Sequence, residues 1–427
     1  MDRFIIEGGQ PLSGTIRPAG NKNEALGVLP AVLLTDEPVV MDNVPQIGDV
    51  QTLLDILADL GVAIERVGEH RIVLDASGVE KTELHPELCQ RIRGSMVLAG
   101  PMLARLGEVR LPRPGGDRIG RRRVDTHVMG LEALGVEAEF SRHYEMRTQP
   151  GGLRGNDILL DEASVTATES TVMAASMARG TTTLRNAASE PHVQQLCRML
   201  NRMGAEISGI GSNTLTIEGV EKLHGTEHTI QADYMEVGSF IGLAAVTGSA
   251  IRIEHATPGN MRMALMVFER LGINVAIEGE DLWVPGDQRL RVNPDLHGAI
   301  PQIYDAPWPG FPADLMSIAL VVATQAEGTM LLFEKMFEGR MFFVDRLIGM
   351  GAAIVLCDPH RAVIVGPSKL YADDLISPDI RAGMALLIAA LCAEGTSVIH
   401  NIRQIDRGYE RIDERLRALG AKIERAA

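Results

Sequence analysis

The chain has 427 residues, of which 45% are hydrophobic and 23% charged, and its formal net charge is −15. This length exceeds the size at which one hydrophobic core keeps growing, so two domains are expected. The acidic balance argues against non-specific nucleic-acid binding, and apolar runs such as 316–323 are far shorter than the roughly 20 residues of a membrane span.

The start of the chain and its cysteines bear on where the protein works. Met1, Asp2 and Arg3 lead directly into a strand pattern, so we expect no secretory signal and a cytoplasmic location. The cysteines show neither a CxxC spacing nor a pairing logic, so disulfides and a structural zinc site are not expected. They are Cys89, Cys197, Cys357 and Cys392.

The first predicted elements are two short strands, 4–6 and 14–16, followed by a helix over 24–34. Asn21, Lys22 and Asn23 stand where this helix opens. An asparagine there usually caps free N–H groups, and by itself the pattern favours a cap. A lysine at a helix N-terminus also has a second interpretation, because its ammonium and the helix dipole together attract an anion.

A hydrophobic residue followed by glycine closes a predicted helix six times along the chain. The separations between these pairs run from 68 to 79 residues, which indicates duplication of one supersecondary module, three copies to a domain. Glycine suits this place because it adopts the left-handed conformation at little cost. The pairs are Leu60-Gly61, Leu134-Gly135, Met203-Gly204, Leu271-Gly272, Met350-Gly351 and Leu419-Gly420.

Charged residues recur where the first helix of a repeat begins. If these helices share one polarity within each domain, their charges meet near one cleft; a solvated helix end explains each charge singly but explains the set less well. The segments are 22–23, 91–95, 312–314 and 379–381.

The segment 111–123 (LPRPGGDRIGRRR) is longer than the equivalent connection in the other repeats. It lies between a strand over 108–111 and a helix over 124–134. Long inserts in compact domains are usually lids or binding loops. Planar guanidinium groups suit phosphate and carboxylate oxygens, so an anion-binding lid is favoured over a solvated charge run. Its arginines are Arg113, Arg118, Arg121, Arg122 and Arg123.

The last repeat begins with a helix over 382–392 that is apolar nearly all round and therefore expected to be buried. A strand over 397–399, an amphipathic helix over 404–419 and a strand from 421 follow.

Several dispersed motifs, in order along the chain, together resemble the UDP-N-acetylglucosamine 1-carboxyvinyltransferases, the enolpyruvyl transferase family of peptidoglycan synthesis. The resemblance covers residues 8–424. It is carried by Asn21-Lys22-Asn23, Arg93-Gly94-Ser95, the Pro114-Gly115-Gly116 loop with Ile119-Gly120, Val124-Asp125, Phe311-Pro312-Ala313-Asp314, Phe337-Glu338-Gly339-Arg340 and Asp406-Arg407-Gly408-Tyr409-Glu410.

The resemblance implies an α/β fold of two inside-out domains, each built from three βαβαββ-like repeats around buried helices. One domain would be discontinuous, over 1–21 and 232–427, and carry Asp314, Arg340, Arg381 and Arg407. The inserted domain, 22–231, would carry the lid loop 111–123.

The implied reaction moves the enolpyruvyl group of phosphoenolpyruvate to a sugar 3-hydroxyl and releases phosphate, with no metal or redox cofactor. The resemblance implies four catalytic residues: Asp117, Asp314, Lys22 and Arg407. Asp314 would be the base for the hydroxyl, and Asn23 would help to orient it. The substrate-binding residues would be Lys22, Asn23, Arg93, Arg122, Arg123, Val124, Asp125, Ser164, Val165, Asp314, Met336, Arg340 and Arg381.

Asp117 stands where most members of the family have a cysteine and a minority have aspartate. A carboxylic acid can donate the same proton, but a free aspartic acid is ionised at neutral pH. We therefore expect lid closure to desolvate Asp117 or to place it against the negative charge of the substrate. We also expect resistance to epoxide inhibitors that alkylate the cysteine.

Three departures bear on the acceptor. The family generally has proline at Arg123, a glycine at Thr166 and a basic residue at Glu162, near the diphosphate. One interpretation is a changed acceptor. The other is that Glu162 points to solvent and Thr166 caps a helix over 169–177.

Three functions therefore stay open: the peptidoglycan enzyme, the same transfer to another nucleotide or nucleotide-sugar acceptor, and a non-catalytic relative. The presence of both Asp117 and Asp314 argues against the last, because binding alone needs neither proton-transfer carboxylate. The expected partners are small molecules, with no nucleic acid and no membrane, and the expected state is a monomer or small homo-oligomer. His127 and His143 are interpreted as surface or packing residues, and 409–411 as structural.

Overall fold

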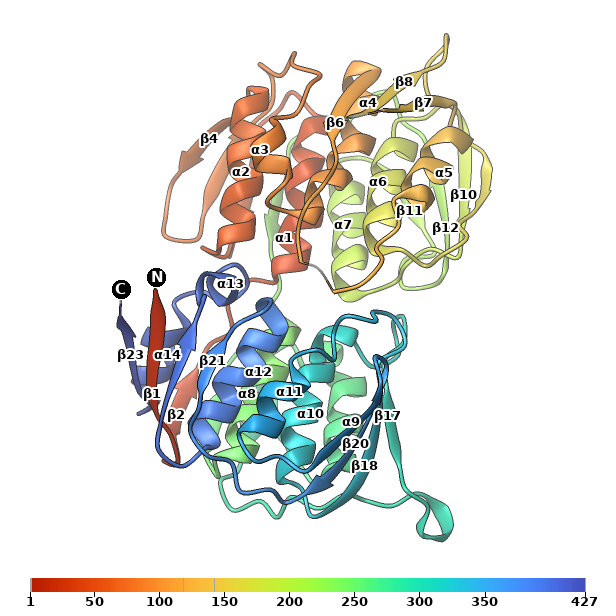
Figure 1. Ribbon diagram of the computed structural model, residues 1–427. Helices are drawn as coiled ribbons and strands as arrows, with labels where there is room; N and C mark the ends of the chain where they lie inside the picture. The colour runs from red at the N-terminus through yellow and green to blue at the C-terminus, as the bar shows by residue number, and fades with distance from the viewer. Residues whose placement is uncertain (1, 118, 142, 427) are drawn as a thin grey trace. The chain divides into compact units, whose positions relative to one another are not determined.

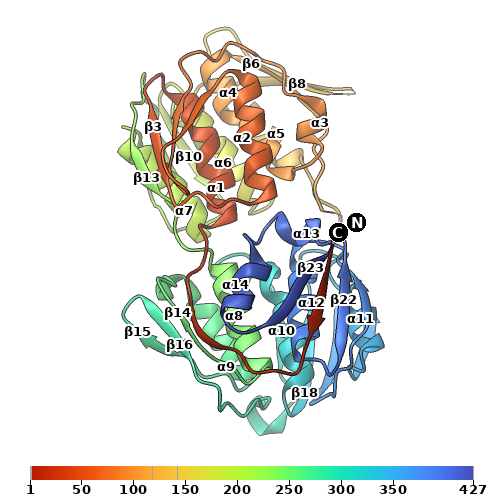
Figure 2. The same ribbon diagram turned by 90° about the vertical axis from the view of Figure 1, so that its left-hand side faces the viewer.

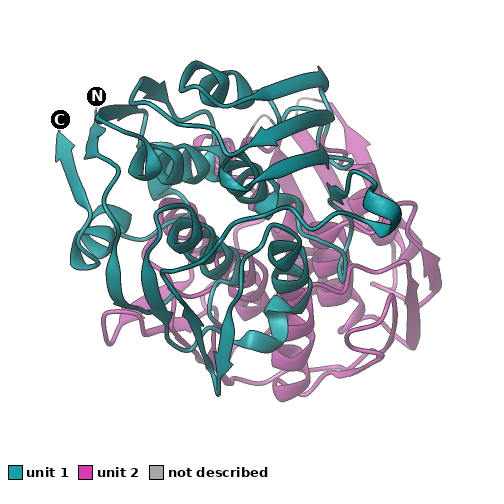
Figure 3. Cartoon of the chain, turned by 90° about the horizontal axis from the view of Figure 1, so that it is seen from below, with its two compact units in different colours: residues 1–19, 118–121, 232–427 teal, residues 20–117, 122–231 magenta. Residues whose placement is uncertain are grey.

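The computed structural model describes residues 2–117, 119–141 and 143–426, so Arg118 of the expected lid lies outside the described residues. The chain separates into two compact units (Figure 3). Unit 1 comprises residues 1–19, 118–121 and 232–427, and unit 2 comprises 20–117 and 122–231. Among the described residues, no helix is both long enough and apolar enough to cross a membrane.

Unit 2 contains three sheets, each with one repeat's strands. The first has the order β13 (Glu227–Thr229), β3 (Val39–Asp42), β5 (Ile72–Asp75), β4 (Ala63–Arg66). The second has the order β6 (Glu108–Pro112), β8 (His143–Thr148), β7 (Val136–Phe140). The third has the order β11 (Glu206–Ser208), β12 (Thr214–Glu218), β10 (Thr181–Arg185), β9 (Asp157–Leu159).

The helices of unit 2 form an inner and an outer set. The inner set packs together in the core and comprises α1 (Lys22–Val28) with the 3₁₀ helix η1 (Leu29–Leu34), η2 (Arg93–Leu98) with α4 (Ala99–Leu106), and α6 (Val165–Ala175). The outer set comprises α2 (Gly48–Leu60), α5 (Asp125–Ala133) and α7 (Pro191–Arg202), and a short α3 (Pro86–Cys89) precedes η2.

Unit 1 repeats this plan with three sheets. Their orders are β15 (Ala276–Glu278), β16 (Asp281–Val284), β14 (Ala250–Ile253), β2 (Ser13–Ile16); β17 (Gln302–Tyr304), β18 (Gly328–Phe333), β20 (Arg361–Gly366), β19 (Ile354–Asp358); and β21 (Asp374–Ile376), β22 (Thr396–His400), β1 (Arg3–Glu7), β23 (Lys422–Ala426). Strands β1 and β23, from the two ends of the chain, lie side by side (Figure 2).

Three inner helices of unit 1 lie together (Figure 1): α8 (Tyr234–Val246), α10 (Met316–Gln325) and α12 (Ile380–Cys392). Residues 380–391 of α12 are all buried, as the apolar composition predicts. Short 3₁₀ helices occur at η3 (Pro258–Met261), η4 (Leu296–Gly298) and η5 (Ala313–Leu315). The outer helices are α9 (Arg262–Arg270), α11 (Val344–Gly349) and α14 (Ile412–Ala418), and α13 (Arg403–Asp406) precedes α14.

The six predicted helix-ending glycines all have positive φ, so the register of the repeats is confirmed. Their φ angles are 107° at Gly61, 92° at Gly135, 103° at Gly204, 85° at Gly272, 106° at Gly351 and 98° at Gly420. Each follows the outer helix of its repeat, where the left-handed conformation ends the helix.

Two helix predictions are wrong in their bounds. The amphipathic pattern over 404–419 predicts one helix, but the chain forms α13 and α14, separated by 407–411. Arg411 has φ 40°, and this left-handed residue stands immediately before α14. Helix α6 begins at Val165 rather than at 169, and its cap is Ser164, whose Oγ accepts a hydrogen bond from the Ala167 N–H at 3.4 Å. Thr166 therefore lies inside the first turn and is not the cap.

Candidate active site

Lys22 lies at the start of α1 in unit 2, and its ammonium is already paired. Its Nζ is 2.9 Å from Asp49 Oδ2 in the first turn of α2, and both side chains are buried. Asn21 caps α1, because its Oδ1 accepts from the Glu24 N–H at 2.8 Å. The cap expected from sequence is thus present at Asn21, and a buried cation stands beside it.

The side chain of Arg93 binds residues 122–123, which form the C-terminal limb of the lid. Its Nη2 donates to the carbonyl oxygens of Arg122 at 2.7 Å and Arg123 at 3.0 Å. Burial lowers the pKa of Arg93 below its ordinary value. The resemblance implies that Arg93 binds substrate. In the structure its guanidinium binds the backbone carbonyls of Arg122 and Arg123, two residues that the resemblance also assigns to substrate binding.

Arg123 is part of an ion-pair network inside unit 2. Its Nε is 2.9 Å from Asp125 Oδ2 and its Nη2 is 2.8 Å from Asp161 Oδ2. Asp161 also accepts from Thr126 Oγ1 at 2.8 Å, and this hydrogen bond is the main cause that lowers the pKa of Asp161. The network ties the lid to the loop before α6.

His127 contacts the first turn of α6 through Thr166. Its ring is buried, with Nε2 2.9 Å from Thr166 Oγ1, while Nδ1 has no hydrogen-bond partner within the described part of the chain. Burial, and then the charges of Arg93 and Arg122, lower the pKa of His127 to about 3. The interpretation of His127 as a surface residue is therefore wrong, and its alternative, packing, is confirmed. Glu162 is exposed.

The first limb of the lid packs closely on unit 2. The Gly115 N–H donates to Cys89 O at 3.3 Å, and a Cβ on Gly115 would sit 1.6 Å from Gln90 O, so only glycine fits there. Asp117, at the end of this limb, is half-buried.

The tip of the lid belongs by its contacts to unit 1. The Gly339 N–H donates to Ile119 O at 2.8 Å, and the Arg121 N–H donates to Glu338 Oε1 at 2.9 Å. Ile119 is buried. The loop 335–340, between β18 and α11, is therefore the seat of the lid tip.

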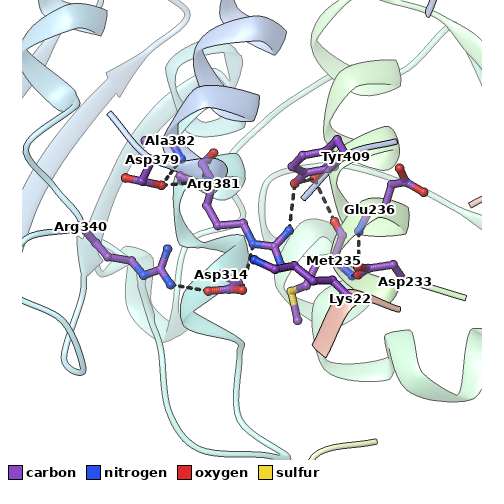
Figure 4. Close-up of polar contacts among 12 residues, drawn as sticks. Lys22, Asp233, Met235, Glu236, Asp314, Arg340, Asp379, Arg381, Ala382 and Tyr409 are labelled. Atoms are coloured by element: carbon purple, nitrogen blue, oxygen red, sulfur yellow. Dashed lines mark hydrogen bonds and ion pairs between the residues drawn. The ribbon is translucent and has the colours of Figure 1, made fainter. Parts of the chain in front are cut away.

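Asp314 lies at η5 in unit 1 between two arginines (Figure 4). Its Oδ2 accepts from Arg381 Nε at 2.9 Å, and its Oδ1 is ion-paired with Arg340 Nη2. The side chains of Arg340 and Arg381 are only 10% and 5% exposed, and Arg340 Nε has no hydrogen-bond partner among the described residues. A carboxylate and two buried guanidinium groups thus meet at one place.

A hydrogen-bonded chain links Arg381 to Tyr409, in the segment before α14, and to Ser239 of α8. Its Nη1 donates to the Tyr409 hydroxyl at 3.3 Å, which is 3.0 Å from Ser239 Oγ (Figure 4). Asp379 caps α12 by accepting from the N–H groups of Arg381 and Ala382. Burial opposes the charge of Arg381, but its neighbours, first Asp314, raise its pKa above the ordinary value. Tyr409 is therefore a buried hydrogen-bond partner of Arg381.

Arg407, Met336 and Asn23 are three further residues of the predicted site. Arg407 Nη1 donates to Gln404 Oε1 at 2.7 Å. Met336 is 39% exposed, and its N–H donates to Asp305 Oδ2 at 3.1 Å. Asn23 is half-buried. Across the described residues, no group of three or more His, Cys, Asp or Glu could hold a metal ion.

Sequence reasoning missed three acidic groups of the candidate site: Asp49 and Asp161, which pair with cations, and Asp305, which accepts from backbone N–H groups. They stand in ordinary first-turn or loop positions, so nothing local distinguishes them from solvated acids. For Asp49 alone there was a signal, since it lies in the first turn of the second helix of the first repeat.

Comparison with known proteins gives one consistent family. Residues 6–416 match the family model for EPSP synthase (3-phosphoshikimate 1-carboxyvinyltransferase). A UDP-N-acetylglucosamine 1-carboxyvinyltransferase of Treponema denticola is 55% identical over 99% of both chains, and one of Bradyrhizobium diazoefficiens is 56% identical over 99% of this chain and 98% of that one. Among solved structures, the enolpyruvyl transferase NikO from Streptomyces tendae matches with a TM-score of 0.88 and 25% identity, over 100% of this chain and 99% of that one.

Proposed function

The chain belongs to the enolpyruvyl transferase family, and from this premise we propose that it transfers the enolpyruvyl group of phosphoenolpyruvate to the 3-hydroxyl of UDP-N-acetylglucosamine, releasing phosphate. The observation that carries this proposal is the full-length likeness to relatives that bear this activity in their names. The fold agrees, because three repeats surround buried helices in each unit. The reaction would be a cytoplasmic first step of peptidoglycan synthesis.

Asp314 is the proposed base. In the addition step its carboxylate takes the proton of the sugar hydroxyl, the hydroxyl oxygen bonds to C2 of phosphoenolpyruvate, and an acid gives a proton to C3. In the elimination step C3 loses a proton, the bond from C2 to the phosphate oxygen breaks, and phosphate leaves with the proton that Asp314 had accepted, which restores the carboxylate. The ion pairs of Asp314 with Arg340 and Arg381 support this role, because they hold its carboxylate at a defined place among the proposed anion-binding cations.

Asp117 is the proposed acid that protonates C3 and later takes that proton back. Its position on a loop whose first limb is packed on unit 2 supports the assignment, since a proton donor must be held at a defined place. Its partial burial supports a site that can lose water when substrate binds.

The proposed anion-binding cations are Lys22, Arg122, Arg340, Arg381 and Arg407. The unpartnered Nε of Arg340 supports this assignment, because a buried N–H without an acceptor gains a hydrogen bond when a phosphate or carboxylate oxygen arrives. Arg93, Arg123, Asp125, Ser164 and Val165 stand around the lid limb and the start of α6 and are proposed to bind or shape the sugar-nucleotide site.

Phosphate release in the presence of phosphoenolpyruvate tests this function. UDP-N-acetylglucosamine should support turnover, whereas UMP and other nucleotide sugars should support far less. Asp117→Ala should abolish turnover and keep the binding of sugar nucleotide, measured by calorimetry. Turnover that prefers a different acceptor would replace the proposed substrate and assign the departures at Glu162, Thr166 and Arg123 to acceptor choice.

A further inference from the structure

The loop 335–340 of unit 1 joins three parts of the candidate site. It carries Met336 and Arg340, and its Glu338 and Gly339 hold the lid tip. Through Arg340 it also reaches Asp314. A small shift of this loop would therefore displace both a proposed substrate-binding cation and the seat of the lid.

Two buried acids accept hydrogen bonds from the backbone of this loop. Asp305, directly after β17, and Glu334, directly after β18, are both 0% exposed. Asp305 accepts from the N–H groups of Lys335 and Met336, and Glu334 Oε1 accepts from the Phe337 N–H at 3.0 Å. Three consecutive backbone donors of the loop thus end on two carboxyl groups.

The two carboxyl groups accept from consecutive N–H groups of one short segment, so they lie close together, and Glu334 Oε2 has no hydrogen-bond partner among the described residues. A proton on Glu334 makes this oxygen a donor to Asp305 and removes the repulsion.

The charged and titratable neighbours of Glu334 act on its carboxyl group in different ways. Burial, then the hydrogen bond and charge of Asp305, raise the pKa of Glu334 to about 9, and Arg340 opposes the rise. From the turn between β19 and β20, His360 meets only the backbone of Glu334: its ring Nδ1 is 2.7 Å from Glu334 O. The Lys335 ammonium turns away to stack on the Tyr304 ring, 3.5 Å from its centroid.

We propose that Asp305 and Glu334 share one proton and act as a positioning pair, which holds the loop 335–340 so that Arg340 faces Asp314 and the lid tip has its seat. Neither residue touches the reacting atoms. The shared proton is essential to this role, because its loss leaves a negative charge on both Asp305 and Glu334. The two charges repel each other and would separate the end of β17 from the loop 335–340. The kinetic part of this inference rests on the proposed function; the structural part does not.

The test compares Glu334→Gln with Glu334→Ala. Glutamine keeps both hydrogen bonds, since its amide oxygen accepts from the Phe337 N–H and its NH₂ donates to Asp305, but it cannot lose the proton. Alanine removes both bonds. Glu327→Gln, at an exposed acid of the same unit that pairs with Arg289, is the matched control.

The first readout is amide hydrogen exchange of the peptide covering 335–340, divided by the intrinsic rate at each pH. In the wild type we expect protection to fall at least tenfold as pH rises through about 9, whereas Glu334→Gln should stay protected and Glu334→Ala should be unprotected at pH 7. Equal pH dependence in the wild type and Glu334→Gln would overturn the proposal. This comparison decides the matter even if Glu334→Ala does not fold.

The second readout is the pH profile of kcat/KM for phosphate release. The wild type should lose activity above pH 9 more steeply than Glu334→Gln, and the control should follow the wild type. A Glu334→Gln profile that keeps the wild-type alkaline fall would also overturn the proposal. A wild type without turnover on any acceptor would instead refute the proposed function, while hydrogen exchange would still test the pair.

Discussion

Removal of Asp314 should destabilise unit 1 as well as stop the reaction. In Asp314→Ala the guanidinium of Arg381 loses its ion pair while it remains buried, at 4% exposure, with the Tyr409 hydroxyl as a neutral partner. An uncompensated buried charge costs about 3–5 kcal/mol. Each kcal/mol lowers Tm by about 2–4 °C in a unit of this size, so we expect a fall of about 6–20 °C.

The cause can be isolated with a double-mutant cycle. Arg381→Met removes the buried charge and fills a similar volume, so Asp314→Ala should cost far less in the Arg381→Met background than alone. Differential scanning calorimetry measures the effect, with the two units treated as separate transitions. The matched control is Glu278→Ala, which removes an exposed carboxylate from its ion pair with the half-buried Arg252 and should leave Tm nearly unchanged.

Two results would refute this reasoning. If Asp314→Ala lowered Tm no more than Glu278→Ala, Arg381 would not depend on Asp314 for its burial. If the double variant lost the sum of the two single losses, the two residues would not be energetically coupled.

Three further predictions concern unit 2 and the lid. Asp117→Asn should lower the rate of phosphate release by about 10²–10⁴-fold. Fosfomycin should leave no covalent adduct on the wild type but should label Asp117→Cys. An adduct at Asp117 found by mass spectrometry would contradict the aspartate mechanism. The folded-state pKa of His127, about 3, lies below its ordinary 6.5, so the unfolded chain takes up this proton first and stability is lost as pH falls from about 6.5 to about 3. In His127→Gln, the slope of the unfolding free energy against pH, measured by urea denaturation, should fall in this window by up to about 1.4 kcal/mol per pH unit. An unchanged slope would show that His127 is not the cause. Arg93→Lys keeps the charge but loses the planar donor that binds the carbonyls of Arg122 and Arg123, so the lid should be held less tightly and trypsin should cleave it faster. An unchanged cleavage rate would show that Arg93 does not hold the lid in place.

The repeats and the buried helices were predictable because their signals are local. A helix that is apolar on every side, such as α12, has to be buried, and a glycine after a helix marks the left-handed residue that ends it. The same kind of reasoning failed at 404–419, where apolar spacing continues through a break. Periodicity reports which side chains share a face, but it does not report the single left-handed residue, Arg411, that divides the helix.

The candidate site was predictable only as a set of residue types. Motifs indicated Lys22, Arg93 and Arg381, but their partners come from other elements: Asp49 in α2, the carbonyls of residues 122–123, and Asp314 in η5. Long cationic side chains can reach many acceptors, so the partner depends on which backbone lies within a few ångströms. The carboxyl pair beneath the loop 335–340 had no sequence signal at all, because Asp305 and Glu334 stand 29 positions apart after different strands.

The amino-acid sequence alone determined the α/β class, the six repeats and the family, because each depends on residues close together in the chain. Tertiary structure decided how the repeats are completed: β2 pairs in parallel with β14 in unit 1, and β13 pairs in parallel with β3 in unit 2. Each of these pairings joins two strands of the same unit that stand about 200 residues apart in the chain, so one repeat of each unit is completed by a distant segment of the sequence. Backbone hydrogen bonds between such strands carry no local signature, since every residue offers the same N–H and C=O groups whichever strand lies beside it.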